Sequence, residues 1–329
     1  MKPQPIPSEI HPSAARPENI RPRGILVPLL TPLLAQDELD INGLERLIEH
    51  VIAGGVYGIF ILGTTGEGQS LSTRLRRELV EHTCRQANHR VPVFIGITDT
   101  SIAESIRMAH YAEQAGAEAV VLSTPYYYPL TQSELLQYTR TVVSRVSLPV
   151  FLYNIPGNTK VEFGIETVRA LTEIPLIRGV KDSSGDMNYL KELIGLLPQR
   201  PDWSILVGPE ELLEPAVFLG AHGGVCGGAN LFPQLYVDLY QAASRGDKSR
   251  SNELQNQVRQ LAGHLYHHDQ YSTGVIKGLK IALACQGLCG DYVAPPLSPY
   301  LPQSRHAIIE FLEQFEKDYL AFPKNKQPL

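Results

Sequence analysis

A lysine and three hydroxyl-bearing residues each stand at or directly after an apolar run. These residues are Lys181, Tyr153 and the threonine pair Thr64 and Thr65. A lysine at the end of a buried strand is partly removed from water, which disfavours its charged ammonium form. The neutral amine can attack a ketone, and the protonated imine then accepts electrons as a carbon–carbon bond breaks or forms. Lys181 is therefore the candidate nucleophile, and the alternative is a lysine that extends to water or pairs with Asp182.

The hydroxyl groups match further needs of imine chemistry. Imine formation requires proton transfer, and a phenol within hydrogen-bond reach can act as acid and base. Tyr153 suits this role, and a tyrosine triple follows the fourth apolar run at 126–128. Thr64 and Thr65, with the backbone N–H groups of a glycine-flanked loop that includes Gly63, could hold a small carboxylate. The alternative for the tyrosines is that they are core residues whose hydroxyls are hydrogen-bonded elsewhere. The alternative for the threonine pair is that its loop is an ordinary turn.

Apolar runs alternate with helical patterns along the chain. Eight runs are predicted as strands, and most are continuously apolar, as in a parallel sheet buried on both faces. They cover residues 25–30, 56–62, 91–97, 119–122, 148–153, 176–180, 204–207 and 223–226. A helix is predicted after each of them. The first carries Leu44, Leu47, Ile48 and Val51 at helical spacing, and the others cover 73–87, 102–115, 130–144, 165–171, 187–197, 210–219 and 231–243. Asp40 and Asp186 are placed to cap the first and sixth of these helices.

Eight strand–helix units favour an α/β fold, a (β/α)8 barrel with a C-terminal helical extension. The alternative is an open doubly wound sheet, but residues 28–32 lack the glycine-rich turn that such a sheet favours after its first strand. Three further helices are predicted at 252–267, 274–284 and 303–319. We therefore expect a proline-rich, poorly ordered arm at 1–23, a barrel at 24–230, and the last barrel helix with a helical region at 231–329.

A barrel would bring the candidate residues together. Working residues of such barrels lie at the carboxyl ends of the strands, which meet at one face. Lys181 ends the sixth predicted strand and Tyr153 the fifth, while Gly208 follows the seventh and Gly227 follows the eighth. We expect them to surround one cavity.

Composition excludes several classes of partner. The formal charge is −5 with no basic stripe, so a nucleic-acid partner is not expected. No apolar run approaches the ~20 residues of a membrane span, and residues 1–23 lack the apolar block of a secretory signal. The four cysteines match no paired zinc-binding pattern. We expect a cytoplasmic enzyme that acts on a small molecule.

Four motifs, in this order, resemble the dihydrodipicolinate synthase and N-acetylneuraminate lyase family. They are Gly-Thr-Thr-Gly-Glu at 63–67, Thr-Pro-Tyr-Tyr-Tyr-Pro at 124–129, Tyr-Asn-Ile-Pro at 153–156 and Gly-Val-Lys-Asp at 179–182. The step of 28 positions from Tyr153 to Lys181 is also the family's spacing. The likeness extends over most of residues 24–299.

The resemblance implies a role for each matching residue. It implies that Lys181 forms the Schiff base, that Tyr153 relays protons, and that Thr64 links Tyr153 to a second tyrosine. Tyr127 matches the tyrosine that reaches into a neighbouring subunit's site. The implied pyruvate-binding residues are Thr65, Gly63, Gly208 and Val225. The resemblance also implies a homo-oligomer, a tetramer or dimer, without metal or organic cofactor.

One position departs from the synthase pattern. Synthases of this family carry, two residues past the proline of Tyr-Asn-Ile-Pro, an arginine that holds the aldehyde's carboxylate, and this chain has Asn158 there. An amide does not replace a bidentate guanidinium. The motifs look closer to 4-hydroxy-2-oxoglutarate and 2-keto-3-deoxy-sugar-acid aldolases, so we expect a pyruvate-dependent aldolase. The alternatives are a dihydrodipicolinate synthase using aspartate semialdehyde, a keto-deoxy-sugar-acid dehydratase, and a non-catalytic oxo-acid sensor.

Overall fold

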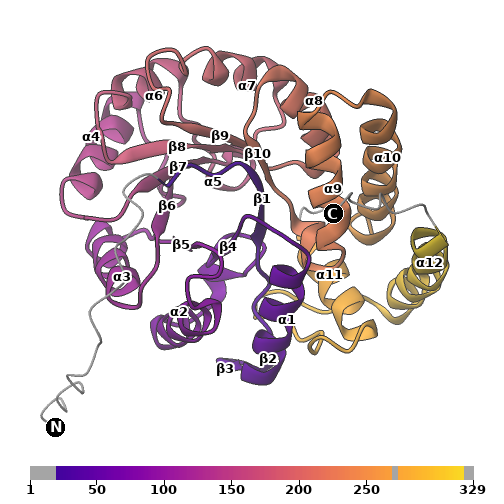
Figure 1. Cartoon of the computed structure of the whole chain (residues 1–329). Helices are drawn as coiled ribbons and strands as arrows, with labels where there is room; N and C mark the ends of the chain where they lie inside the picture. The colour runs from indigo at the N-terminus through magenta and orange to yellow at the C-terminus, as the bar shows by residue number, and fades with distance from the viewer. Residues whose placement is uncertain (1–19, 269–272, 322–329) are drawn as a thin grey trace, which may run out of the picture.

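The chain folds into a closed barrel of eight parallel strands surrounded by helices (Figure 1). The computed structural model describes residues 20–268 and 273–321. The barrel strands are β1 (Gly24–Pro28), β4 (Gly58–Ile61), β5 (Val93–Gly96), β6 (Ala119–Ser123), β7 (Val150–Asn154), β8 (Ile177–Asp182), β9 (Ser204–Val207) and β10 (Gly223–Val225). Pairing of β1 with both β4 and β10 closes the ring. The predicted barrel and its eight strands are confirmed.

Helices return the chain between successive strands. They are α1 (Ile41–Ala53), α2 (Thr73–Ala87), α3 (Ile102–Gln114), α4 (Gln132–Val143), α6 (Ile165–Leu171), α7 (Met187–Ile194), α8 (Leu213–Leu219) and α9 (Pro233–Ser244). The Asp40 carboxylate accepts the Gly43 N–H at 2.8 Å, and that of Asp186 accepts the Asn188 N–H at 2.8 Å. Both predicted caps are therefore confirmed.

Alternation along the strands separates two apolar layers. Successive residues of a strand point to opposite faces, so each barrel strand serves the interior and the helix layer in turn. On β7, Phe151 and Tyr153 belong to the interior cluster, whereas Val150 and Leu152 belong to the outer core. Ile20 also belongs to the interior cluster. Of the arm predicted at 1–23, residues 1–19 lie outside the described residues.

Several short elements were not predicted. These are the hairpin β2 (Leu33–Ala35) and β3 (Glu38–Leu39), the short helix α5 (Pro156–Thr159), and the turns η1 (Gly68–Ser70) and η3 (Gly227–Asn230). The single helix predicted at 210–219 is wrong, because it is divided into η2 (Glu210–Leu212) and α8. Pro215 lies in the first turn of α8, the part of a helix that tolerates a residue without an N–H.

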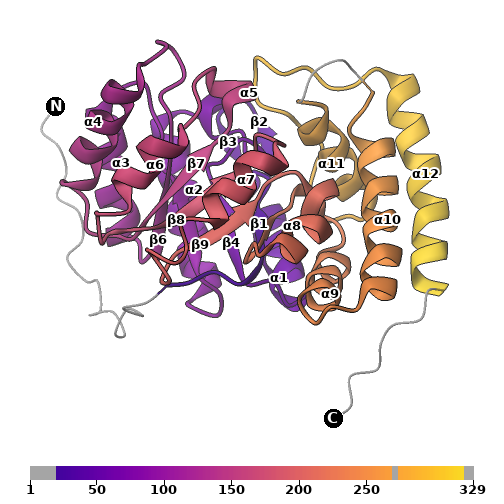
Figure 2. The ribbon, with the colours of Figure 1, turned by 90° about the horizontal axis from the view of Figure 1, so that it is seen from above.

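The C-terminal helices gather at one side of the barrel (Figure 2). They are α10 (Lys248–Leu265), α11 (Gly274–Cys285) and α12 (Pro302–Ala321). Both views place α12 outside α10, and α11 packs between this layer and the turn η3 of the barrel. Within 20–268 and 273–321, no helix combines the length and the apolarity needed to cross a membrane.

Candidate active site

Lys181 and Tyr153 are direct neighbours across the pair β7–β8. Each side chain is buried in the barrel, and the Lys181 Nζ lies 3.9 Å from the centroid of the Tyr153 ring. The ring of Phe60, on β4, lies 5.2 Å from the same nitrogen. The Lys181 nitrogen therefore sits among aromatic faces with a phenol beside it.

Asp182 does not pair with the neighbouring lysine. Its carboxylate accepts hydrogen bonds from the Asn154 amide and the Ser184 hydroxyl, each at 2.9 Å. Consecutive strand residues point to opposite faces, so this carboxylate lies away from the interior. The alternative in which Lys181 pairs with Asp182 is thereby set aside, because the Asp182 oxygens are occupied elsewhere.

The Tyr153 phenol lies within hydrogen-bonding reach of the side chains of Thr64, Lys181 and Ser183. Burial alone raises the pKa of Tyr153. The Lys181 charge and the three hydrogen bonds outweigh burial, so the net effect is a pKa below the ordinary phenol value. A phenol with a lowered pKa gives up its proton more readily, which suits an acid–base group.

Two cavities meet at this cluster. One is about 370 Å³ and contains Lys181 and the strand ends of β8, β9 and β10, while the other is about 250 Å³ and reaches β5 and β6. Both are lined by Thr64, Tyr153, Ile155 and Asn158. The first also includes the predicted residues Thr65, Gly208 and Val225, and the second includes Gly63.

Tyr127 is the predicted site residue that the fold does not bring to Lys181. Its side chain is 73% exposed and lies edge-on to the Tyr128 ring, with centroids 4.9 Å apart. Both tyrosines line a separate, larger hollow of about 720 Å³ along α4. Neither Lys181 nor Tyr153 lines that hollow, so its size does not make it the site of the chemistry.

The ends of β7 to β9 are fixed by polar contacts that the sequence reasoning missed. The Gly208 N–H donates to the Asp182 carbonyl at 2.6 Å, and the Ser183 N–H donates to the Asn154 carbonyl at 2.8 Å. A Cβ on Gly208 would lie 1.9 Å from the Ser183 Oγ, so the close approach requires glycine. In the sequence, Ser183 was marked by its position directly after a strand. Its proximity to Tyr153 follows only from the tertiary structure.

A buried carboxylate supports the opposite wall. Glu210 accepts the Tyr236 hydroxyl at 2.6 Å, the Tyr266 hydroxyl at 2.8 Å and the Gly228 N–H at 2.9 Å. Burial, followed by the charge of Glu211, raises the pKa of Glu210 to about 7 despite these hydrogen bonds. Sequence reasoning missed this network because both tyrosines come from helices, α9 and the end of α10.

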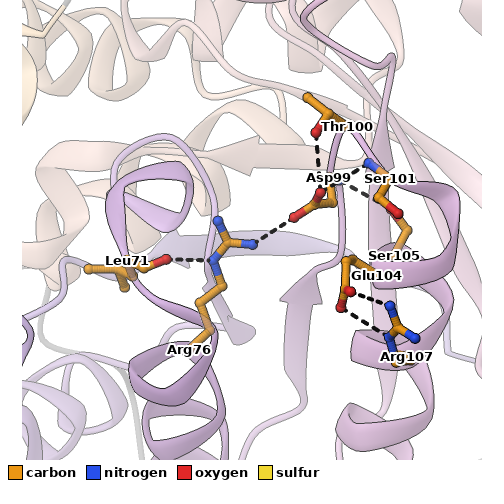
Figure 3. Close-up of polar contacts among 8 residues, drawn as sticks. All are labelled: Leu71, Arg76, Asp99, Thr100, Ser101, Glu104, Ser105 and Arg107. Carbon is orange, nitrogen blue, oxygen red and sulfur yellow. Dashed lines mark hydrogen bonds and ion pairs between the residues drawn. The ribbon is translucent and has the colours of Figure 1, made fainter.

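Polar contacts hold the segment that follows β5 (Figure 3). The Asp99 carboxylate accepts the Arg76 guanidinium at 3.1 Å and the Ser101 N–H at 3.0 Å. Thr98, one residue earlier, lines the cavity and accepts the Ser123 N–H at 2.8 Å. This segment therefore contributes neutral hydroxyl groups at fixed positions.

A parallel barrel with a lysine and a phenol facing one cavity at its strand ends has the architecture of a barrel enzyme. Residues 21–315 match the model of the dihydrodipicolinate synthetase family. The chain therefore belongs to this family of pyruvate-dependent aldolases and is an enzyme of the lyase class. Among the described residues, no group of three or more His, Cys, Asp or Glu side chains is arranged to hold a metal ion.

Individual relatives support the assignment. A dihydrodipicolinate synthase structure from Bacteroides thetaiotaomicron is 47% identical, with a TM-score of 0.86 over 89% of this chain and 98% of that one. A prophage protein of the dihydrodipicolinic acid synthase family from E. coli K12, solved with pyruvate, is 30% identical, with a TM-score of 0.84 over 89% and 98%. The 4-hydroxy-tetrahydrodipicolinate synthase of Ralstonia nicotianae is 32% identical over 87% of this chain and 95% of its own length.

Proposed function

We propose that the protein is a Schiff-base aldolase that cleaves a 2-oxo acid with a neutral, hydroxylated tail into pyruvate and an aldehyde, or joins the two. The observation that carries this proposal is the Lys181 amine, buried against the Tyr153 phenol in a cavity at the strand ends. Lys181 is the nucleophile, Tyr153 and Thr64 move protons, and Thr65 with the backbone of the 63–68 loop binds the carboxylate.

The reaction proceeds through an imine on the lysine. The Lys181 amine attacks the ketone carbon, and Tyr153 donates the proton with which the former carbonyl oxygen leaves as water. In the protonated imine, the bond between the third and fourth carbons breaks as the fourth carbon's hydroxyl gives its proton to Tyr153, and the fourth carbon becomes the carbonyl of the aldehyde. The released electron pair forms an enamine. Protonation of the enamine and hydrolysis of the imine return pyruvate and the free lysine.

The cavity favours an uncharged tail on the substrate. Among the described residues that line the two cavities, Lys181 is the only cationic side chain. The acidic side chains beside it are Glu210 and Glu211, while Asn158 and Gln69 offer amides. A tail carboxylate would find no charged partner and would face like charge from Glu211. This supports a 2-keto-3-deoxy-sugar-acid substrate over 4-hydroxy-2-oxoglutarate, whose tail is charged.

A second candidate is condensation of pyruvate with aspartate semialdehyde. The names of the relatives favour it, because the Bacteroides and Ralstonia proteins are both named as synthases of this type. The absence of an arginine at position 158 counts against it, since the aldehyde's carboxylate would lack a bidentate partner.

Trapping tests the imine. The protein is incubated with pyruvate and borohydride, weighed, and digested to locate the adduct. We expect one reduced pyruvate adduct on Lys181, none in Lys181→Ala, and wild-type trapping in Lys191→Ala, which removes an exposed lysine of α7. An adduct on another residue, or no gain in mass, would contradict the imine mechanism.

A substrate panel tests the tail. Pyruvate release from 2-keto-3-deoxy-sugar acids and from 4-hydroxy-2-oxoglutarate is measured beside condensation with aspartate semialdehyde. We expect the neutral-tailed acids to react best and Asn158→Arg to shift the preference toward charged tails by ~10-fold or more. Efficient condensation with aspartate semialdehyde by the wild type would favour the second candidate, the synthase function, over the aldolase.

We also propose that the protein works as a homo-oligomer, a tetramer or a dimer. Tyr127 and Tyr128 place two large, exposed aromatic rings beside a hollow on a single chain. Exposed aromatic patches of this kind mark interaction surfaces. Such an interface would carry Tyr127 toward a neighbouring site.

A further inference from the structure

The loop that carries Thr64 and Thr65 is joined to the C-terminal helices by a buried ion pair. The Glu67 carboxylate contacts the Lys280 ammonium of α11, and their side chains are 0% and 1% exposed. The same carboxylate accepts the Ala294 N–H at 2.6 Å, and Lys280 donates to the Tyr292 carbonyl at 2.5 Å. The contact joins parts of the chain more than two hundred residues apart.

The ion pair acts on a backbone that is held in an unfavourable conformation. Glu67 has a φ of 55°, in the left-handed region that residues with side chains rarely occupy. Its N–H donates to the Thr64 carbonyl at 3.0 Å and closes the turn that presents the two threonines. Residues in this region persist only when their surroundings fix them. The buried contacts of the Glu67 side chain supply that constraint.

The turn has no other side-chain anchor of comparable burial and charge among its described contacts. Thr31 donates to the Gly66 carbonyl at 2.7 Å, which is a single neutral bond. Burial lowers the pKa of Lys280, and the negative charge of Glu67 opposes this shift. A buried ammonium that loses its carboxylate partner becomes an uncompensated charge, which is strongly destabilising. The two side chains therefore stay together.

We propose that the Glu67–Lys280 ion pair fixes the turn that positions Thr65 for the substrate carboxylate. This inference rests on the proposed function, in which Thr65 binds that carboxylate. Glu67 and Lys280 line neither cavity, so they act through the shape of the turn. The C-terminal helices thereby take part in pyruvate recognition, since α11 also lines the cavity with Val275 and Ile276.

The test compares two ketones that differ in their charge. Pyruvate and pyruvamide are trapped separately on the full-length protein with cyanoborohydride, and the initial rate of adduct formation on Lys181 is measured against concentration. The ratio of the two half-saturating concentrations reports how well the carboxylate is recognised. A general loss of stability lowers the trapping rates of both ketones together. A displaced 63–68 loop lowers only the preference for pyruvate over pyruvamide.

The variants are Glu67→Gln, Lys280→Met and the double variant. The double variant removes both charges, so it leaves no unpaired buried charge, and it decides the test if a single variant does not fold. The control is Glu214→Gln, which neutralises another buried carboxylate, one that accepts the Ser251 hydroxyl at 2.7 Å and lines neither cavity. We expect the preference for pyruvate to fall by about 10- to 100-fold in the double variant and to stay unchanged in the control.

The outcomes separate this inference from the proposed function. Trapping on Lys181 in the wild type with an unchanged preference in the folded double variant would overturn the positioning role and leave the aldolase proposal intact. A lower preference in Glu214→Gln of the same size would also overturn it, because the effect would then follow from lost stability. Failure of the wild type to trap pyruvate would overturn both.

Discussion

At the scale of single residues, the proposed chemistry depends on the position of one phenol. Tyr153 lies beside the lysine, and its hydroxyl is within reach of the side chains of Thr64, Lys181 and Ser183. Removal of the hydroxyl leaves the ring, and therefore the contact with the Lys181 nitrogen, in place. The phenol's role in proton transfer can thus be separated from its role in packing.

We expect Tyr153→Phe to slow imine formation by ~100-fold or more, because the leaving hydroxyl then lacks its proton donor. The rate of pyruvate trapping under saturating pyruvate measures this step. Ser183→Ala, which removes another partner of the phenol, should have a much smaller effect. A wild-type rate in Tyr153→Phe would assign proton transfer to another group.

At the scale of elements, the strand ends are spaced so closely that small residues become obligatory. Gly208 follows β9 and packs against the first residue after β8. The Asp182 carbonyl accepts its N–H, so the two strand ends cannot separate without losing that bond. The position of Ser183, directly after β8, depends on this contact.

We expect Gly208→Ala to weaken pyruvate binding and lower stability by about 1–3 kcal/mol, as overpacking does in a tight interior. The added Cβ would lie 2.9 Å from the Ser183 Cβ and 1.9 Å from the Ser183 Oγ. The double variant with Ser183→Gly should recover part of both losses. The half-saturating pyruvate concentration in trapping and the melting temperature measure the two effects. Full binding in Gly208→Ala alone would show that the strand ends can move apart.

At the scale of the whole molecule, the Glu210 network joins the barrel to the C-terminal helices. Its carboxylate binds tyrosines from α9 and from the end of α10, and it also holds the backbone of η3. A fully buried carboxyl with a raised pKa binds its proton more tightly in the folded than in the unfolded chain. Such a group stabilises the fold most at low pH.

We expect this contribution to be complete below the unfolded pKa near 4.5 and to be lost as the pH rises through the folded value of about 7. Its size is on the order of 3 kcal/mol. In Glu210→Gln the titration is absent, so the stability difference between wild type and variant should shrink as the pH rises. Denaturant unfolding of both proteins across this range measures it. A difference that grows with pH would mean that the hydrogen bonds lower the pKa.

The oligomer proposal predicts complementation between inactive subunits. Lys181→Ala and Tyr127→Ala chains, each inactive alone, should regain roughly a quarter of wild-type turnover when co-assembled in equal amounts, because a mixed dimer contains one complete site. Lys181→Ala with Tyr153→Phe is the matched control and should regain nothing, since both residues belong to the same chain's site. No recovery in the first mixture would place Tyr127 outside the neighbour's site.

The sequence by itself determined the barrel and most of the cavity. Continuous apolar runs specify buried parallel strands, and the ends of parallel strands in a barrel meet at one face, so local patterns were sufficient to place Lys181, Tyr153, Thr64 and Gly208 together. Helix caps such as Asp40 were predictable because a cap bonds to the backbone only two or three residues away.

Only the tertiary structure decided which distant residues complete the site. Glu67 meets Lys280, and Glu210 meets Tyr266, across long separations in sequence. A pattern of spacing reports contacts within one strand or helix, whereas these pairings depend on how the C-terminal helices pack against the barrel. The carboxylates and amides around the lysine come from segments that follow three different barrel strands, so only the closed barrel brings them to one site.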